Sequence, residues 1–366
     1  MKNLLSGSLL LLTLGLGAQN VNIVPLGHMR RDIPRKEIRI PNVLGYQTLK
    51  CDFHMHTIFS DGDVWPTVRV QEAWEEGLDA ISITDHIENQ PSKPHVAGDH
   101  NAPYEIALPK AQEMGIMLIR GGEITRSMPP GHLNAIFLSD VNALDTETPY
   151  EAIEAANAQN AFVMWNHPGW RAQQPDTCRW WPEHEELYRK GWIHGIEVFN
   201  EKEWYPVVLD WCKEKNLAVI ANSDIHDMNA HYYDVVNAHR PMTLVFSRDR
   251  SESGLREAMF ANRTLAYFDN KLAGREDLLK AVFEASLKVQ LISTNSEKKY
   301  HTYNISNVSD LTYRIELEDG RSISFPANAT RQVRLPLEVK NQKIKVLNLL
   351  HASNACLETD FVLPQP

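Results

Sequence analysis

The chain has 366 residues, of which 43% are hydrophobic and 23% are charged, and its formal net charge is −10. This composition is typical of a globular protein with enough apolar material for a large core and a second, small domain. The acidic balance argues against nucleic acid as a partner, because nucleic-acid-binding surfaces carry a basic excess. The four cysteines, Cys51, Cys178, Cys212 and Cys356, are widely spaced, so the sequence predicts neither a thiolate zinc site nor a particular disulfide pairing.

Residues 1–18 are typical of a secretory signal peptide. Lys2 precedes a leucine-rich run, and small residues, ending at Ala18, follow it. An uncleaved membrane anchor is the alternative, but the run is short for a bilayer, and no other segment approaches the roughly 20 apolar residues that a spanning helix needs. We therefore predict a periplasmic or secreted protein without a membrane span. The oligomeric state cannot be inferred.

Residues 19–48 contain three prolines and are expected to form an extended N-terminal arm. Predicted strands then alternate with predicted helices. Strands are expected at 49–54, 80–84, 116–120, 133–138, 161–165, 193–199 and 217–221, and helices at 65–77, 104–115, 150–158, 183–190 and 204–215. This alternation indicates an α/β fold of parallel βαβ units, and about seven units suggest closure into a barrel over residues 49–285.

The composition changes near residue 287. Short alternating segments separated by turn signals, such as Asp319-Gly320, predict a small antiparallel β-sandwich of the immunoglobulin-like type over residues 286–366. A helix over about 275–287 is expected to cover the barrel base or to join the two parts. The sandwich offers no catalytic cluster.

Imidazoles and carboxylates recur where the predicted strands end. His54 and His56 follow the first strand, and because alternate side chains of a strand point the same way, they can share one metal ion. Residues after the other strands, together with Asp61 and His132 in adjoining loop or strand-start positions, complete a set of nine donors: His54, His56, Asp61, His86, Glu123, His132, His167, Asp224 and His226. In a βα barrel the carboxyl ends of the strands converge on one mouth, so these residues are expected to meet.

Each donor taken alone could have an ordinary structural role. Asp61 could cap a turn, and His167 could simply pack before Pro168. Nine donors at one barrel mouth would, however, be costly to leave without cations. Nitrogen and oxygen donors without thiolate favour zinc, manganese or iron over calcium.

The motifs that carry these donors resemble those of the PHP (polymerase and histidinol phosphatase) metal-dependent phosphoesterases. The resemblance covers about residues 49–268 and rests on His54-x-His56, Ser60-Asp61-Gly62, Thr84-Asp85-His86, Gly122-Glu123, His132, Asn166-His167-Pro168 and Ser223-Asp224-x-His226. It implies a distorted seven-stranded (β/α)7 barrel with three divalent metal ions. The longer strings LKCDFHMHT, SMPPGHLNAIFL and WNHPGW are most similar to a secreted branch that includes phosphodiesterases acting on synthetic organophosphate diesters.

The resemblance also implies which residues share each ion. One ion is expected to be bound by His54, His56, Glu123 and Asp224, a second by a bridging Glu123 with His132 and His167, and a third by Asp61, His86 and His226. Some family members carry a histidine at the position of Asp61.

We therefore predict an exported metal-dependent phosphoesterase that hydrolyses phosphodiesters of small organic alcohols with metal-activated water. Asp85 is expected either to orient a liganding imidazole or to cap its loop. Arg126 and Arg171, together with His95 and His100, lie in loops that follow strands and are candidates for binding phosphate. Five tryptophans are candidates for the pocket wall, although core packing is the commoner role of such residues: Trp65, Trp165, Trp170, Trp180 and Trp181.

Three other functions are compatible with the same residues. A phosphomonoesterase would use the same ions. An amidohydrolase-like enzyme would too, but such enzymes often carry a metal-bridging lysine, whereas Glu123 occupies the probable bridging position here. A non-enzymatic binding protein with structural zinc would need closed sites of four protein ligands, which nine donors shared over three ions do not give.

Overall fold

The computed structural model describes residues 23–24, 26–29 and 33–365. The predicted signal peptide lies outside these residues, as does part of the predicted N-terminal arm. The chain divides into two units, Met1–Pro34 and Arg35–Pro366. In the first unit, the described residues include a short 3-10 helix, η1 (Gly27–Met29). In the described part of the chain, no helix is both long enough and apolar enough to cross a membrane.

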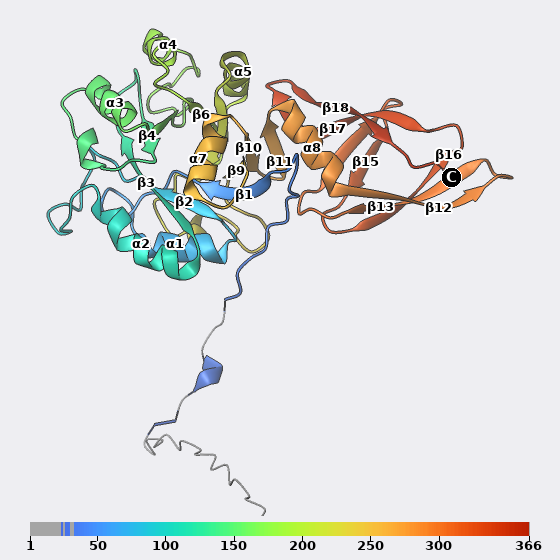
Figure 1. Ribbon diagram of the computed structural model, residues 1–366, viewed down its shortest axis with the longest axis horizontal. Helices are drawn as coiled ribbons and strands as arrows, with labels where there is room; N and C mark the ends of the chain where they lie inside the picture. Colours follow the sequence, from blue (N-terminus) through green and yellow to red (C-terminus); the bar gives the residue numbers. More distant parts are fainter. Residues whose placement is uncertain (1–22, 25, 30–32, 366) are drawn as a thin grey trace, which may run out of the picture. The chain divides into compact units, whose positions relative to one another are not determined.

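The predicted alternation of strands and helices is present up to residue 222 and continues beyond it. The strands are β1 (Gln47–Asp52), β2 (Ala80–Ile83), β3 (Met117–Ile124), β4 (Leu133–Ile136), β5 (Phe162–Trp165), β6 (Gly195–Asn200), β7 (Glu203–Trp204), β8 (Ala218–Asn222), β9 (Met242–Ser247), β10 (Thr264–Phe268) and β11 (Lys271–Gly274). The helices are α1 (Pro66–Glu75), α2 (Ala102–Met114), η2 (Asn142–Leu144), α3 (Pro149–Ala158), α4 (Pro182–Arg189), α5 (Pro206–Lys215), α6 (Asn229–Tyr232), α7 (Glu252–Phe260) and α8 (Glu276–Ser286) (Figure 1).

Local sequence explains where several helices begin and end. A proline in the first turn starts α1, α3, α4 and α5, where its missing N–H costs nothing. Thr148 and Glu151 form a reciprocal capping box at the start of α3. Gly115, with a φ of 67°, ends α2 in the left-handed conformation that glycine adopts without strain.

The large sheet is rich in parallel pairs but is not wholly parallel. β1, β2 and β3 pair in parallel, as do β5, β6 and β8. β4 runs antiparallel to β3, to which a loop rather than a helix joins it, and it is also antiparallel to β5, although α3 lies between them in the chain. The expectation of parallel βαβ units throughout was therefore wrong at β4. The strands β9–β11, which the sequence analysis did not assign, extend the sheet in antiparallel fashion from β1.

The far edge of β8 lies beside β9 and β10, with threonine side chains between them. Thr243 of β9 accepts a hydrogen bond from Ala221 N at 3.0 Å and donates one to Ala221 O at 2.9 Å. Thr264 of β10 accepts one from Val219 N at 3.1 Å. The sheet therefore curls, and buried side chains such as Phe53 and Ile220 fill its interior. The regular seven-fold barrel stays a prediction.

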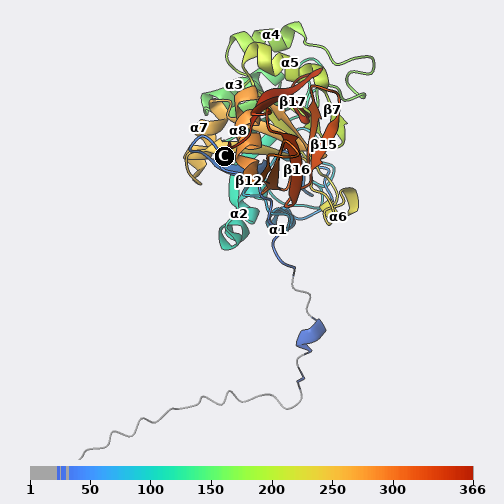
Figure 2. The same cartoon turned by 90° about the vertical axis from the view of Figure 1, so that its right-hand side faces the viewer.

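The C-terminal strands form two antiparallel layers. They are β12 (Leu287–Asn295), β13 (Tyr300–Asn307), β14 (Tyr313–Leu317), β15 (Ser322–Phe325), β16 (Thr330–Pro336), β17 (Asn341–Ala352) and β18 (Ala355–Val362). β12, β13 and β16 make a separate three-stranded sheet, whereas β17 joins the large sheet through a parallel pairing with β11. Tyr303 of β13 and Ile315 of β14 belong to one hydrophobic cluster. In Figure 2, which is turned by 90° from Figure 1, the C-terminal strands face the viewer. The predicted domain boundaries remain predictions.

Candidate metal centre

The ends of β1, β2, β3 and β8 meet through backbone hydrogen bonds. Asp224 N donates to His54 O at 2.8 Å, and His56 N donates to Ile225 O at 3.0 Å. Glu123 N donates to the carbonyl of Asp85 at 3.1 Å. These hydrogen bonds join segments up to 170 residues apart in sequence at one end of the sheet. The sequence predicts such a meeting of strand ends.

All nine predicted donors lie together at this end of the sheet. They form four overlapping groups, and within each group one ligand atom per residue lies within 4.8 Å of the others: His56, Asp61, His86 and His226; His54, Glu123 and His167; His54, His56 and Asp224; and His86, Glu123 and His132. The described residues thus offer several sites that could hold a metal ion.

Glu123 occupies the centre of the cluster. Its Oε1 lies 3.0 Å from His132 Nδ1 and 3.7 Å from His167 Nε2. Its Oε2 lies 2.7 Å from His86 Nδ1 and 3.5 Å from the Nε2 atoms of both His54 and His56. Glu123 is fully buried, so the geometry suits the bridging position that the family resemblance implies.

The groups differ in several respects from the ligand sets that the resemblance implies. Glu123 is not grouped with His56 and Asp224, and His132 and His167 fall in separate groups, with His86 and with His54. His56 lies near Asp224, at 2.9 Å, but it also joins the group of Asp61, His86 and His226. The rings of His56 and His226 stack with their centroids 4.1 Å apart. His56 can therefore serve either of two neighbouring groups.

The charges of the cluster are strongly coupled. Burial alone would raise the pKa of Glu123, but the neighbouring imidazoles, chiefly His86 and His54, hold it well below its ordinary value. Burial, together with His86 and His226, lowers the pKa of His56 to about 3. Burial opposes protonation of His54, His86, His167 and His226 too, but the carboxylates beside them raise the pKa of each of these rings. A metal ion would take the place of these protons, because a liganding imidazole must be neutral.

Several buried polar atoms here are left without a hydrogen-bond partner among the described residues. They include His54 Nε2, Asp61 Oδ1, Glu123 Oε2 and His132 Nδ1. Leaving a buried polar atom unpaired costs about 1–3 kcal/mol. Each of these atoms belongs to a residue of the four donor groups. A set of oxygen and nitrogen atoms of this kind fits divalent cations such as zinc, manganese or iron.

The backbone is strained or crowded at three positions of the site. His167 and Asp224 have φ angles of 27° and 50°, in a region that residues other than glycine rarely adopt. A Cβ on Gly62 would lie 2.7 Å from the backbone carbon of His56. Only glycine therefore fits where the loop that carries Asp61 crosses the segment that carries His56.

Two residues that support the site were missed by the sequence analysis. Glu197, fully buried in β6, lies 2.8 Å from His54 Nδ1 and accepts a hydrogen bond from His167 N at 2.8 Å. Arg69, fully buried in α1, donates hydrogen bonds to the backbone carbonyls of His56, Ile225, His226 and Asp227 at 2.7–3.1 Å. A signal for Glu197 existed, since a charged residue inside the apolar run GIEVFN of a strand covered on both faces is unusual.

Asp85 holds the loop after His56. Its carboxylate accepts hydrogen bonds from the backbone N and the hydroxyl of Thr57 and from Ser60 Oγ, each at 2.6 Å. Ser60 Oγ in turn lies 3.4 Å from His56 Nδ1. Asp85 therefore caps its loop and lies one residue, Ser60, away from the imidazole of His56; its role in orienting that ring stays a prediction.

The two candidate arginines lie outside the pocket wall. Arg126 donates hydrogen bonds to the carbonyls of Glu147 and Thr146 and pairs with Glu88. Arg171 is exposed. His95 is exposed, and His100 lies near Gln90 and Asp145. Within residues 33–365, none of these four candidates lines the pocket over the metal cluster.

A pocket of about 410 Å³ opens over the cluster. Its lining comprises Asp61, His86, Asn89, Thr125, His132, His167, Trp170, Asn200, Glu201, Glu203, Tyr205, Asp224 and His226. Among the described residues, no lysine or arginine lines it. Of the five candidate tryptophans, only Trp170 lines the pocket. It has 42% of its surface exposed, and its ring centroid lies 5.3 Å from that of His167. Trp165 is fully buried and stacks on His184.

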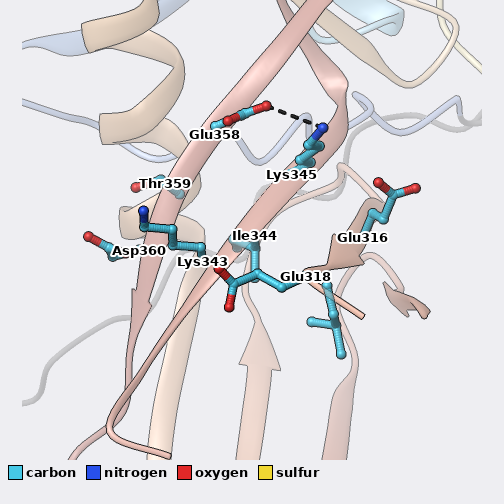
Figure 3. A pocket seen from close by; sticks show the side chains of 9 residues that line it. Glu316, Glu318, Lys343, Ile344, Lys345, Glu358, Thr359 and Asp360 are labelled. Carbon is cyan, nitrogen blue, oxygen red and sulfur yellow. Dashed lines mark ion pairs between the residues drawn. The ribbon is translucent and has the colours of Figure 1, made fainter. Parts of the chain in front are cut away.

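Another pocket, of about 420 Å³, lies on the C-terminal sheet formed by β14, β17 and β18. Figure 3 shows that charged side chains of both signs line it. Lys345 and Glu358 pair at 3.4 Å. None of the donor groups of the described chain lies in this pocket.

The mixed α/β fold and the histidine–carboxylate cluster define a metal-dependent hydrolase. A two-domain protein from Bacteroides vulgatus, which contains a predicted PHP-like metal-dependent phosphoesterase, has a crystal structure similar to this chain, with a TM-score of 0.87 and 45% sequence identity over 90% of this chain and 99% of the other. The chain belongs to this PHP-like metal-dependent phosphoesterase family.

Other solved structures are more distant. An amidohydrolase from Chromobacterium violaceum has 13% identity and a TM-score of 0.37, over 48% of this chain and 87% of that one. PsfC from Pseudomonas syringae has 17% identity and a TM-score of 0.41, over 65% of this chain and 96% of that one. No protein-family model matches the chain, and no curated protein does.

Proposed function

We propose that this protein is an exported, trinuclear metal-dependent phosphodiesterase of the secreted PHP branch, built on a distorted (β/α)7 barrel, and that it hydrolyses phosphodiesters of small organic alcohols. The observation that carries the diester assignment is the charge of the pocket wall. Two carboxylates outside the donor set, Glu201 and Glu203, line it, while no lysine or arginine of the described chain does so. A diester carries one negative charge, whereas a monoester at neutral pH carries nearly two, so this wall disfavours the monoester.

The nine donors would hold the ions, with Glu123 between the groups. Bound ions of this kind supply activated water at neutral pH and neutralise phosphoryl oxygens. The chain's own residues orient the donors. Arg69 fixes the backbone at His56 and along residues 225–227, which follow Asp224, and Asp85 fixes Ser60 beside His56. Trp170 supplies an exposed apolar face at the pocket mouth, which suits the organic group of an ester.

The pocket wall also bears on the amidohydrolase alternative. Glu123 contacts imidazoles of several groups at once, and no lysine of the described chain lines the pocket. This arrangement favours phosphoryl transfer over an amidohydrolase that uses a bridging lysine.

A panel of chromogenic substrates tests the proposal. The purified protein, loaded with manganese, iron or zinc, should hydrolyse bis(p-nitrophenyl) phosphate with a higher kcat/KM than p-nitrophenyl phosphate, and it should leave p-nitroacetanilide intact. Chelation should abolish turnover, and the variants His86→Ala and Asp224→Asn should lose it while remaining folded. Preferred hydrolysis of the monoester or the anilide, or full turnover in either variant, would overturn the assignment.

A further inference from the structure

Glu197 is a buried carboxylate whose two oxygens are fully used by the metal site's framework. Oε1 lies 2.8 Å from His54 Nδ1 and accepts a hydrogen bond from Asn222 Nδ2 at 2.9 Å. Oε2 accepts hydrogen bonds from His167 N and Asn200 Nδ2, both at 2.8 Å. Glu197 is absent from the four donor groups of the described chain, so its role differs from that of a ligand.

The partners of Glu197 come from four separate strand ends. His54 follows β1, His167 follows β5, Asn200 ends β6 and Asn222 ends β8. Asn200 Nδ2 also lies 3.3 Å from Asp224 Oδ2, and Asn222 Oδ1 accepts a hydrogen bond from Phe53 N at 2.9 Å. One carboxylate therefore ties together the strands that deliver two of the imidazoles.

The contact with Glu197 decides which nitrogen of His54 carries the proton. A carboxylate only accepts hydrogen bonds, so Nδ1 must be the donor, and the lone pair of the neutral ring is then on Nε2. His54 Nε2 lies 3.0 Å from Asp224 Oδ1 and 3.5 Å from Glu123 Oε2, yet it has no hydrogen-bond partner among the described residues. The lone pair thus faces the donor groups.

We propose that Glu197 is a positioning residue, which holds His54 as its Nδ1–H tautomer and fixes the backbone of His167 so that both rings present Nε2 to a metal ion. The inference rests on the proposed function, since it assumes that the cluster binds metal. Carboxylates that hydrogen-bond to the far nitrogen of a liganding histidine typically contribute 10–100-fold to metal affinity or activity.

The variant Glu197→Gln tests the role with almost no change of shape. A glutamine side chain has one acceptor oxygen, so its NH2 group must face two of the four N–H groups that now donate hydrogen bonds to Glu197. A matched control is Asp79→Asn. Asp79 is also a buried carboxylate, and it pairs with Lys50 at 2.7 Å. It precedes β2, whereas His86 follows that strand, so Asp79 lies at the end of β2 away from the metal donors. Metal affinity is measured for the full chain by competition with a chelator, using zinc, with thermal unfolding in parallel.

We expect zinc affinity to fall about 10–100-fold in Glu197→Gln and to change less than twofold in Asp79→Asn. Unchanged affinity in Glu197→Gln would overturn the positioning role while leaving the proposed function intact. A wild-type protein that binds no divalent metal would instead overturn the proposed function, and the inference with it.

A second measurement on the wild-type protein does not depend on whether the variant folds. In protein labelled with ¹⁵N-histidine and loaded with zinc, the ring nitrogens of His54, assigned against His54→Gln, should show a protonated Nδ1 and a metal-bound Nε2. The opposite tautomer, with Nε2 protonated, would refute the proposal.

Discussion

The two oxygens of Glu123 face different histidines: Oε1 lies 3.0 Å from His132 Nδ1, and Oε2 lies 2.7 Å from His86 Nδ1. Two of the four donor groups contain this one fully buried carboxylate. Its removal should therefore affect several ions at once, whereas removal of a peripheral donor such as Asp61 should affect one.

We expect Glu123→Gln to lower both metal content and diester turnover, the latter by on the order of 100-fold or more, because a neutral amide neither bridges ions nor balances the surrounding imidazoles. Elemental analysis and steady-state kinetics check this. Glu105→Gln, an exposed residue of α2, is the control and should match the wild type. Full metal content in Glu123→Gln would contradict a central role for this residue.

Arg69 should matter for stability as well as for the site. Its buried guanidinium donates to four backbone carbonyls and pairs with the partly buried Glu72 at 2.8 Å. Arg69→Met removes one donor from each of these carbonyls, of which those of Ile225 and His226 keep a backbone donor, and it removes the cation beside Glu72. The free energy of unfolding should therefore fall by about 3–5 kcal/mol. Urea denaturation measures this. A loss below about 1 kcal/mol, comparable to that in the exposed Arg171→Ala control, would show that water replaces the guanidinium.

The acidic pocket wall predicts how substrate preference responds to charge. Glu203 accepts a hydrogen bond from Tyr205 Oη at 2.6 Å, and Glu203→Gln removes one negative charge from the wall. The ratio of monoester to diester kcat/KM should rise several-fold, since one charge at pocket distances is worth on the order of 1 kcal/mol in water. The rise should shrink in high salt. An unchanged ratio, equal to that of the exposed Glu154→Gln control, would remove the charge argument for a diester.

His184 gives the folded protein a defined pH dependence. Burial against Trp165 lowers its pKa to about 4, from about 6.5 in an unfolded chain. Between these values the unfolded state binds more protons, so the free energy of unfolding should fall as the pH drops from 6.5 to 4, by at most about 1.4 kcal/mol per pH unit. Urea unfolding of metal-free protein at pH 7 and pH 5 measures the loss. His184→Gln should show a smaller loss, and an identical loss would contradict the assignment.

The clustering of the nine candidate donors could be predicted because most of them stand where an apolar strand turns into a loop, and strand ends of such sheets converge. The spacing of two residues between His54 and His56 also predicts that both side chains point to the same side of the extended chain. The antiparallel course of β4 could have been suspected, because only the short stretch after Ile124 precedes Leu133 and no helix signal lies within it.

The supporting residues were harder to predict for physical reasons. An arginine on a helix, such as Arg69, is usually solvated, and only the packing of α1 against the loop after Ile225 buries it. Arg126 and Arg171 are phosphate-binding candidates because they lie in loops after strands. In the structure, however, the guanidinium of Arg126 donates to a backbone carbonyl and pairs with Glu88, and no sequence pattern predicts these contacts. Tertiary contacts of this kind carry no periodic signal.

Anomalous diffraction from crystals of the manganese- or zinc-loaded protein tests the central claim most directly. We predict strong peaks between the donor atoms of His54, His56 and Asp224, beside Glu123, and between Asp61, His86 and His226, at metal–ligand distances of about 2.0–2.3 Å. A loaded crystal in which these atoms surround no peak would contradict the metal centre and, with it, the proposed hydrolase.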